Sequence, residues 1–274
     1  MARRSKVKAA VEAESDPSAW ILENDLAQFL LMHTTEIKYM CMFGYTYLHG
    51  CKVFGKTSTA SSSTSYKFIS MVLACTGGGI LVPIFINSIP VPLCTDAYPI
   101  AILVSTMLHM AFPIVREVVG LSAIVKTVFM MLYEIMRAFV VVKLTTAAGA
   151  AIPASDFDFA VFGPIFCGTL AGCGGAFLPL DKGLTPIKEN GLAPNMVSAC
   201  VAATSYHLFM NLYSDGIQNA DKKAHVCIAA FFIIFGLVNE FKLLSFTNNN
   251  DSTSSPAAVV KEEGKKKEES KKTK

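Results

Sequence analysis

The stretch Thr76-Gly77-Gly78-Gly79-Ile80-Leu81-Val82-Pro83 has a second version in this chain, Gly172-Cys173-Gly174-Gly175-Ala176-Phe177-Leu178-Pro179. In both versions a pair of glycines precedes a proline by the same distance, within a segment that is otherwise apolar and as long as a helix. Gly78 and Gly174 are 96 residues apart, and the two prolines keep that separation. The repetition indicates that the chain consists of two related halves.

Glycine and proline at matching positions of two halves are typical of broken helices that line a path through a membrane. Backbone carbonyls freed at such breaks can replace part of an ion's hydration shell. The alternative interpretation is that the small residues only let neighbouring helices approach closely. The predicted pore and kink residues are Gly77, Gly78, Gly79, Pro83, Gly172, Gly174, Gly175 and Pro179.

The composition indicates a membrane protein. Of the 274 residues, 52% are hydrophobic and 16% are charged, and the mean hydropathy is +0.45. These values lie outside the usual range of soluble proteins. The net charge of +3 says little about partners. Glutamates interrupt the lysines of the C-terminal tail, so we expect no nucleic-acid partner, and membrane lipids are the expected contacts.

Seven segments are long and apolar enough to cross about 30 Å of hydrocarbon. An offset of 96 residues covers three of these segments, so the second half must cross the membrane in the opposite sense to the first. The predicted fold is an all-α membrane protein with seven transmembrane helices, arranged as a 3+3 inverted repeat plus one extra helix. The segments are residues 25–48, 68–87, 98–115, 121–142, 157–180, 194–213 and 224–244.

This fold divides the chain into five parts. The Asn, Ser, Lys and Glu of the last part cannot bury enough apolar surface to fold, so we expect a disordered tail. Lysines and arginines that flank the spans place this tail in the cytosol. The parts are an N-terminal tail (1–24), the first three-helix repeat (25–119), the second, inverted repeat (120–215), the seventh helix (216–245) and the tail (246–274).

Ionisable residues inside the spans are the candidates for function. Glu134 and Arg137 are three residues apart in the fourth span and therefore share a helix face, with Tyr133 and Lys126 on roughly the same stripe. Lys38 lies in the first span. One interpretation is a polar lining or an anionic-lipid site in which Arg137 binds a phosphate. The alternative is a structural ion pair that joins the fourth span to its neighbours.

The sequence has no pattern typical of an enzyme or a metal site. His109 and His207 lie in the third and sixth spans with no carboxylate or cysteine at ligand spacing, which favours packed, hydrogen-bonded histidines over ligands or a proton relay. None of the eight cysteines belongs to a CxxC pair. The sequence contains neither a Walker loop nor a dinucleotide fingerprint. We expect no catalytic residue, no metal and no cofactor other than a bound lipid.

Together, the paired glycine interruptions, the inverted repeat with a seventh helix and the basic tail resemble the trimeric intracellular cation channel (TRIC) family of endoplasmic and sarcoplasmic reticulum membranes. The stretch Tyr133-Glu134-Ile135-Met136-Arg137 stands where that family has a Lys-Glu-Val-x-x-Arg-like motif. The resemblance implies a homotrimer with one pore in each protomer. It also implies passive flow of monovalent cations, chiefly potassium, that balances charge during calcium release.

In eukaryotic members of the family, the lysine and arginine of the motif hold a phosphoinositide headgroup. Arg137 matches the arginine, whereas Tyr133 replaces the lysine and Lys126 is the nearby cation. Arg137 and Lys38 are expected to act as electrostatic gates or lipid anchors, because fixed positive charge repels cations.

The final residues Lys271-Lys272-Thr273-Lys274 resemble the dilysine retrieval signal of endoplasmic reticulum membrane proteins. This agrees with the location that the family resemblance implies. Two other functions remain open on the sequence. One is a secondary transporter of a small solute built on the same inverted repeat. The other is a structural tether of the membrane.

Overall fold

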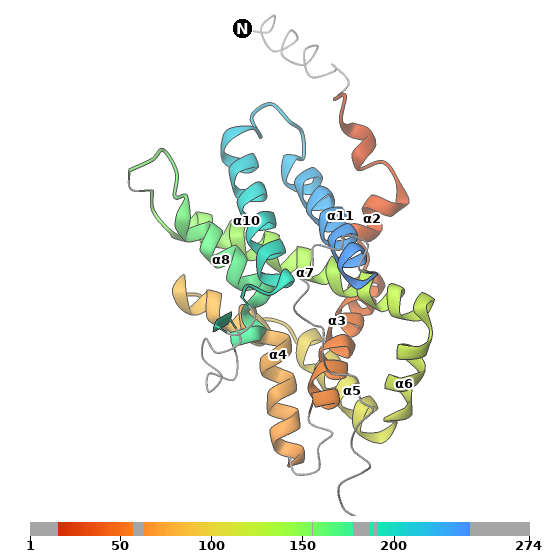
Figure 1. Cartoon of the computed structure of the whole chain (residues 1–274). Coiled ribbons are helices and arrows are strands. Elements are labelled where there is room, and N and C mark those ends of the chain that lie inside the picture. Colours follow the sequence, from red (N-terminus) through yellow and green to blue (C-terminus); the bar gives the residue numbers. More distant parts are fainter. Residues whose placement is uncertain (1–15, 57–62, 155, 178–186, 189–190, 242–274) are drawn as a thin grey trace, which may run out of the picture.

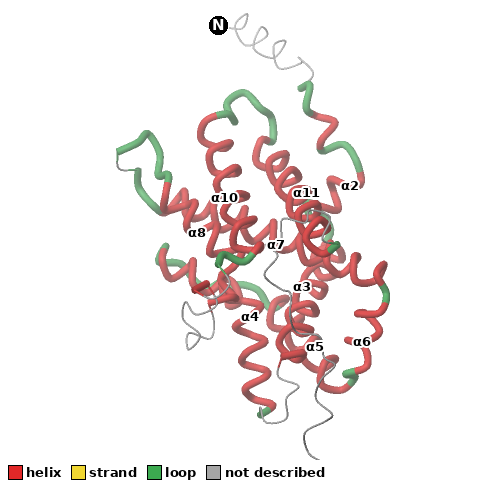
Figure 2. Tube along the Cα trace, in the orientation of Figure 1, coloured by secondary structure: helices red, strands yellow, loops and turns green. Residues whose placement is uncertain are grey.

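The computed structural model describes residues 16–56, 63–154, 156–177, 187–188 and 191–241. Every regular element in these residues is a helix, which confirms the prediction of an all-helical protein for this part of the chain (Figure 2). Pro179 and the predicted C-terminal tail lie outside the described residues.

The first predicted span, residues 25–48, is not one helix. The chain ends α2 at Leu30 and begins α3 at Thr35, and Met32 between them has a positive φ of 50°. Asn24 caps α2, because its side chain accepts a hydrogen bond from the N–H of Ala27 at 2.7 Å. The helices of the first half are α2 (Asp25–Leu30), α3 (Thr35–Lys56), α4 (Thr64–Phe85), α5 (Ala97–Ala111) and α6 (Ile114–Leu121).

The third predicted span, residues 98–115, is also shorter than expected. It ends in a bend of 99° between α5 and α6, at Pro113. Proline lacks the N–H that would continue the helix, which explains the position of the bend.

The second half follows the predicted spans more closely. Its elements are α7 (Ala123–Ala151), α8 (Phe162–Cys173), the 3-10 turn η3 (Gly174–Phe177), α10 (Pro194–Leu212) and α11 (Ala220–Glu240). The helix α7 has 29 residues and extends well beyond the predicted end at residue 142.

The long helix α7 lies at the centre of the protein. It packs against α3 from the first half and against α8, α10 and α11 from the second (Figure 1). Its buried face carries Ile135, Met136 and Val141, and it meets small residues such as Ala202 on α10 and Ala229 on α11. Small residues let helices in a membrane approach closely. Most of the site residues discussed below are on α7 or on helices that touch it.

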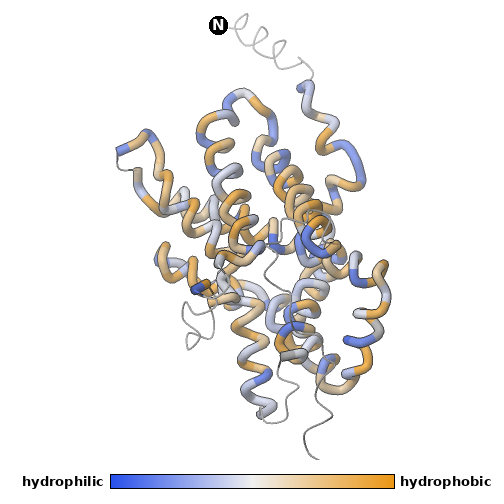
Figure 3. Tube along the Cα trace, in the orientation of Figure 1, coloured by the Kyte–Doolittle hydropathy of each residue, from blue (hydrophilic) through white to orange (hydrophobic). Residues whose placement is uncertain are grey.

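Apolar residues predominate along most of the helices (Figure 3). Among the described residues, α4 and α11 are each long and apolar enough to cross a bilayer, and the bent pair α5 and α6 meets the same criterion as one span. The chain is therefore a multi-pass membrane protein. The count of seven spans stays a prediction.

An ion pair ties the N-terminal segment to the start of α11. Lys223, which is 4% exposed, pairs with Asp16 and donates a hydrogen bond to Ser18 Oγ at 2.7 Å. The hydroxyl of Ser18 in turn donates to Asp16 Oδ1 at 2.7 Å. The hydrogen bonds from Lys223 and Ser18 lower the pKa of the Asp16 carboxyl from its ordinary value of 3.8 to about 2.

We expect the N-terminal segment to leave α11 as the pH falls from about 4 to about 2. A carboxyl whose pKa is lower in the folded state stabilises that state above its ordinary pKa, and the contribution is lost as the pH falls through the lowered pKa. Trp20, the only tryptophan of the sequence, lies in the adjacent 3-10 turn η1 (Ala19–Ile21). Its fluorescence anisotropy should therefore decrease over this pH range.

The matched variant for this prediction is Asp16→Asn. It should show low Trp20 anisotropy already at neutral pH, with little further change on acidification, because the amide cannot form the ion pair with Lys223. A wild-type anisotropy that stays constant down to a pH of about 2 would show that this ion pair does not hold the segment.

Candidate functional site

The two glycine patterns meet in space, where α4 crosses the end of α8. A Cβ atom added at Gly78 would lie 2.3 Å from the carbonyl oxygen of Ala171. A Cβ atom added at Gly175 would lie 2.3 Å from the carbonyl oxygen of Ala74. Both distances are far shorter than van der Waals contact, so the two backbones touch directly and only glycine fits.

The crossing is reciprocal. A Cβ atom at Gly77 would lie 2.7 Å from the carbonyl oxygen of Gly174, and a Cβ atom at Gly174 would lie 2.9 Å from the carbonyl carbon of Gly77. By these contacts, three residues of the first half are equivalent to three residues of the second half. The equivalent pairs are Ala74 and Ala171, Gly77 and Gly174, and Gly78 and Gly175, and the two members of each pair are 97 residues apart. At the crossing, the offset between the halves is therefore one residue longer than the predicted 96. Gly79 lies outside the crossing, and a Cβ atom there would meet Val91 Cβ at 3.4 Å.

Neither predicted helix break is seen among the described residues. The helix α4 is continuous through its glycines and through Pro83, so the predicted break in the second span is wrong. The helix α8 passes directly at Gly174 into the 3-10 turn η3, which is a change of helix type, and a break in the fifth span stays a prediction. Close approach of the two helices accounts for the glycines on both sides of the crossing.

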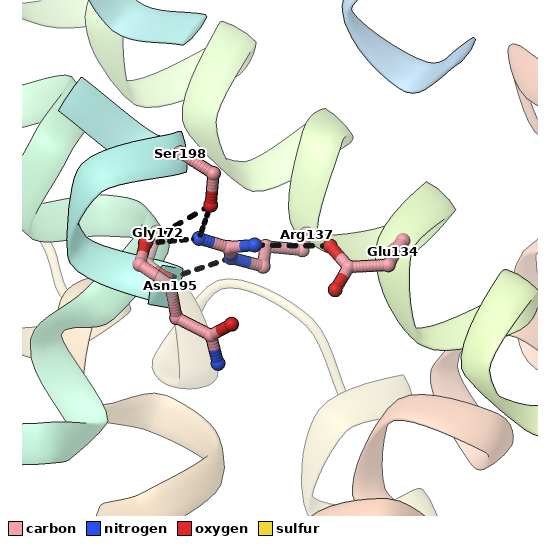
Figure 4. A network of polar contacts seen from close by, with 5 residues as sticks. All are labelled: Glu134, Arg137, Gly172, Asn195 and Ser198. Carbon is pink, nitrogen blue, oxygen red and sulfur yellow. Dashed lines mark hydrogen bonds and ion pairs between the residues drawn. The ribbon is translucent and has the colours of Figure 1, made fainter. Parts of the chain in front are cut away.

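Beside this crossing, Arg137 joins α7 to α8 and α10 (Figure 4). Its side chain is 2% exposed. Nε donates to the carbonyl of Gly172 at 2.9 Å, and Nη2 donates to Ser198 Oγ at 2.9 Å and to the carbonyl of Asn195. Gly172 is in the last turn of α8, where carbonyls lack partners within the helix. A cation at this place donates to such a carbonyl and also interacts favourably with the negative end of the helix dipole.

The remaining contacts of Arg137 are with Glu134 and Phe232. Nη1 donates to Glu134 Oε2 at 3.0 Å, and Glu134 is 5% exposed. The guanidinium carbon lies 4.4 Å from the ring centroid of Phe232 on α11. Arg137 therefore contacts three helices besides its own through protein groups alone. This geometry favours the structural ion pair, and a role in gating or lipid binding stays a prediction.

Tyr133 faces α3 rather than the Arg137 cluster. Its ring stacks on Tyr45 with centroids 5.0 Å apart and an interplanar angle of 14°. His49 lies at 5.4 Å from the same ring, and the ammonium of Lys52 lies 5.2 Å from its centroid. A lysine of α3 thus brings a positive charge to Tyr133.

The other two predicted cations lie elsewhere. Lys126 is 47% exposed and forms an ion pair with Glu240 at the end of α11. Lys38 is half-buried near the start of α3 and has no ion pair within the described part of the chain. The structure therefore brings Glu134 and Arg137 together and leaves Lys126 and Lys38 apart from them.

Sequence reasoning missed Asn195, Ser198 and Phe232. A signal existed for the first two, because they are three residues apart at the start of α10 and so place two polar residues on one face of an apolar helix. Phe232 lies in a run of apolar residues that gives no sign of a cation above it.

An apolar pocket of about 340 Å³ lies between α8 and α10, next to the Arg137 contacts. Cys173, which follows the Gly172 bound by Arg137, lines it. Its lining is otherwise almost entirely aliphatic or aromatic, so a hydrocarbon chain suits it better than a polar ligand. The other lining residues are Phe166, Thr169, Leu170, Phe177, Ile187, Leu192, Met196, Val197, Cys200 and Val201.

No family model matches the chain, and no curated protein sequence matches it. Two solved structures share its fold. One is a trimeric intracellular cation channel from C. elegans with bound Ca²⁺, with a TM-score of 0.65 and 18% identity over 82% of this chain and 98% of that chain. The other is such a channel from C. elegans in the absence of Ca²⁺, with a TM-score of 0.58 and 16% identity over 85% and 97%. The predicted resemblance is thus confirmed for the fold.

Proposed function

We propose that this chain forms a cation channel of the trimeric intracellular type, assembled as a homotrimer with one pore in each protomer. The observation that carries the proposal is the shared fold, which extends over nearly the whole length of the two C. elegans channel chains. The reciprocal glycine crossing supports an inverted repeat of three helices in each half, with α11 as the additional helix.

The proposal includes the ion and the location. We expect monovalent cations, chiefly potassium, to pass through the pore and to balance charge during calcium release from the endoplasmic or sarcoplasmic reticulum. The lysines and arginines that flank the spans support a cytosolic location of the tail. Catalysis is not part of this function.

Arg137 has a specific place in this proposal. Its position between α7, α8 and α10 suits a residue that fixes the relative positions of these helices, and so controls whether a path between them is open. It is unsuited to select cations, because positive charge repels them.

A lipid remains the proposed regulator. A phosphate bound at Arg137 would have to replace protein partners of the guanidinium, whereas Lys52 above Tyr133 has its ammonium on an exposed side chain. We therefore propose that a phosphoinositide headgroup would bind near Lys52. The apolar pocket between α8 and α10 separately suits a hydrocarbon chain.

The test is the current through purified protein in a planar bilayer under a potassium gradient. We expect discrete single-channel steps that reverse near the potassium equilibrium potential. Cross-linking of the same preparation should give a trimer. A silent bilayer combined with saturable solute uptake in liposomes would instead identify a secondary transporter, and the absence of any flux would leave the structural tether.

A further inference from the structure

The two halves share a second pattern, in which a threonine precedes a histidine by three residues. It consists of Thr106 and His109 in α5 and of Thr204 and His207 in α10, at a separation of 98 residues. Nε2 of each histidine forms a hydrogen bond with a backbone carbonyl. The distance from His109 Nε2 to the carbonyl oxygen of Tyr47 is 3.0 Å, and the distance from His207 Nε2 to the carbonyl oxygen of Ala160 is 2.5 Å. A carbonyl can only accept, so Nε2 carries the hydrogen and Nδ1 of the neutral ring is an acceptor.

The two halves differ in the hydrogen-bond donor to Nδ1 of the histidine. In α10, Asn211 Nδ2 donates to the backbone carbonyl of His207 at 2.7 Å, and it also lies 3.3 Å from His207 Nδ1 and donates to it. The corresponding position of the first half is Pro113, which has no polar side chain. His109 Nδ1 and Thr106 Oγ1 are both buried without a hydrogen-bond partner among the described residues, in side chains that are 2% and 4% exposed.

Packing holds the ring of His109 in this orientation. The ring stacks on Tyr47 with centroids 4.7 Å apart and on Phe54 with centroids 5.4 Å apart. It also lies so close to α3 that a Cβ atom at Gly50 would be 2.1 Å from His109 Cδ2. The imidazole cannot turn to find a protein donor without breaking this packing.

We propose that Thr106 and His109 form a binding site for one buried water molecule, which takes the place that the Asn211 side chain has in the second half. Side chains three residues apart on a helix have Cβ atoms about 5–6 Å apart, and one water can bridge their polar atoms with hydrogen bonds of about 2.8 Å. The water donates one hydrogen bond to Nδ1 and shares one hydrogen bond with the threonine hydroxyl, as donor or as acceptor. Buried waters typically occupy such otherwise unsatisfied sites.

The site lies at the bend between α5 and α6. In an uninterrupted helix the carbonyl of His109 would accept from the N–H of residue 113, which is proline here. Arg116 Nη1 replaces that donor at 3.0 Å. Arg116 therefore donates to the carbonyl of His109, which the proline leaves without a backbone donor, and the water donates to the side chain of His109.

The test compares Thr106→Val with the matched variant Thr204→Val in the full-length, detergent-solubilised protein. If the water is present, Thr106→Val removes one of its anchors and should lower Tm by about 2–4 °C. Thr204→Val should change Tm by much less, because His207 already has Asn211. If no water is bound, Thr106→Val removes an unpaired buried hydroxyl and should raise Tm.

A high-resolution density map gives the second measurement. We expect a peak within hydrogen-bond distance of both Thr106 Oγ1 and His109 Nδ1 in the wild type, and its loss in Thr106→Val. An unchanged or raised Tm of Thr106→Val, or a map without this peak, would overturn the proposal. Neither measurement depends on ion conduction, so the result is independent of the proposed channel function.

Discussion

Gly78→Ala is expected to destabilise the protein by about 3 kcal/mol, whereas Gly79→Ala, one residue further, should leave it as stable as the wild type. The new methyl group at position 78 would lie 2.3 Å from the carbonyl oxygen and 2.7 Å from the Cα of Ala171. Both are backbone atoms that cannot rotate away, so α4 and α8 would have to separate. At Gly79 the nearest atom is Val91 Cβ at 3.4 Å, and alanine is the better helix former.

The measurement is Tm in detergent, together with the monodisperse fraction in size-exclusion chromatography. We expect Gly78→Ala to lose roughly 6–12 °C in Tm. Gly175→Ala should be equally damaging, because its methyl group would meet the carbonyl of Ala74 at the same distance of 2.3 Å. Equal stability of Gly78→Ala and Gly79→Ala would contradict the crossing as described.

The glycine pairs could be found in the sequence, but their partners could not. Composition and spacing predict two special helices, and they do not reveal that these helices touch each other. The register was ambiguous for a physical reason: three consecutive glycines, Gly77 to Gly79, allow two alignments, and the prolines favour the wrong one. The structure resolves the ambiguity through Ala74 and Ala171, whose carbonyls need a glycine opposite.

Helix ends were predictable only where the sequence marks them. Hydropathy does not predict the turn at Met32, because methionine is apolar. The sequence pattern does not predict it either, because a left-handed backbone is unusual for methionine. The predicted length of α7 is too short because threonines and alanines follow its apolar centre. In the structure the hydroxyls of Thr145 and Thr146 bond to the carbonyls of Val141 and Val142, which lets these polar residues continue a buried helix.

In the candidate site, too, some contacts are predictable from the sequence and others are not. The pair of Glu134 and Arg137 follows from helix geometry and is present in the structure. Helix spacing predicts Lys126 on the same stripe, yet Lys126 pairs with Glu240 from α11, a helix far along the chain whose position the sequence does not reveal. Local spacing therefore predicted contacts within a helix, and contacts between helices required the fold.

Arg137→Ala is expected to be at least as damaging as Gly78→Ala, with a loss of about 3–5 kcal/mol. It removes the hydrogen bonds to Gly172, Asn195 and Ser198, and it leaves the Glu134 carboxylate buried without a counter-charge. Arg137→Lys should recover little of this loss, because a single ammonium cannot bind the carbonyls of α8 and α10 and the carboxylate at the same time.

A double-mutant cycle measures how much of the loss comes from the unpaired carboxylate. We expect Arg137→Ala/Glu134→Ala to be more stable than Arg137→Ala alone, because the double variant buries no charge at this position. Tm and the monodisperse fraction in detergent are the readouts. A double variant less stable than Arg137→Ala would show that Glu134 stabilises the protein through contacts other than the ion pair.

The folded double variant also separates the two roles proposed for Arg137. If the arginine is only a structural ion pair and does not control the path, a variant that regains stability should conduct in a planar bilayer with wild-type conductance, open probability and lipid dependence. If the arginine is a gate or a lipid anchor, open probability or lipid dependence should change while the Tm is largely restored. The comparison works because the ion pair is 2% to 6% exposed and its removal leaves the lipid-facing surface unchanged, so altered conduction would have to arise from the interior of the protomer.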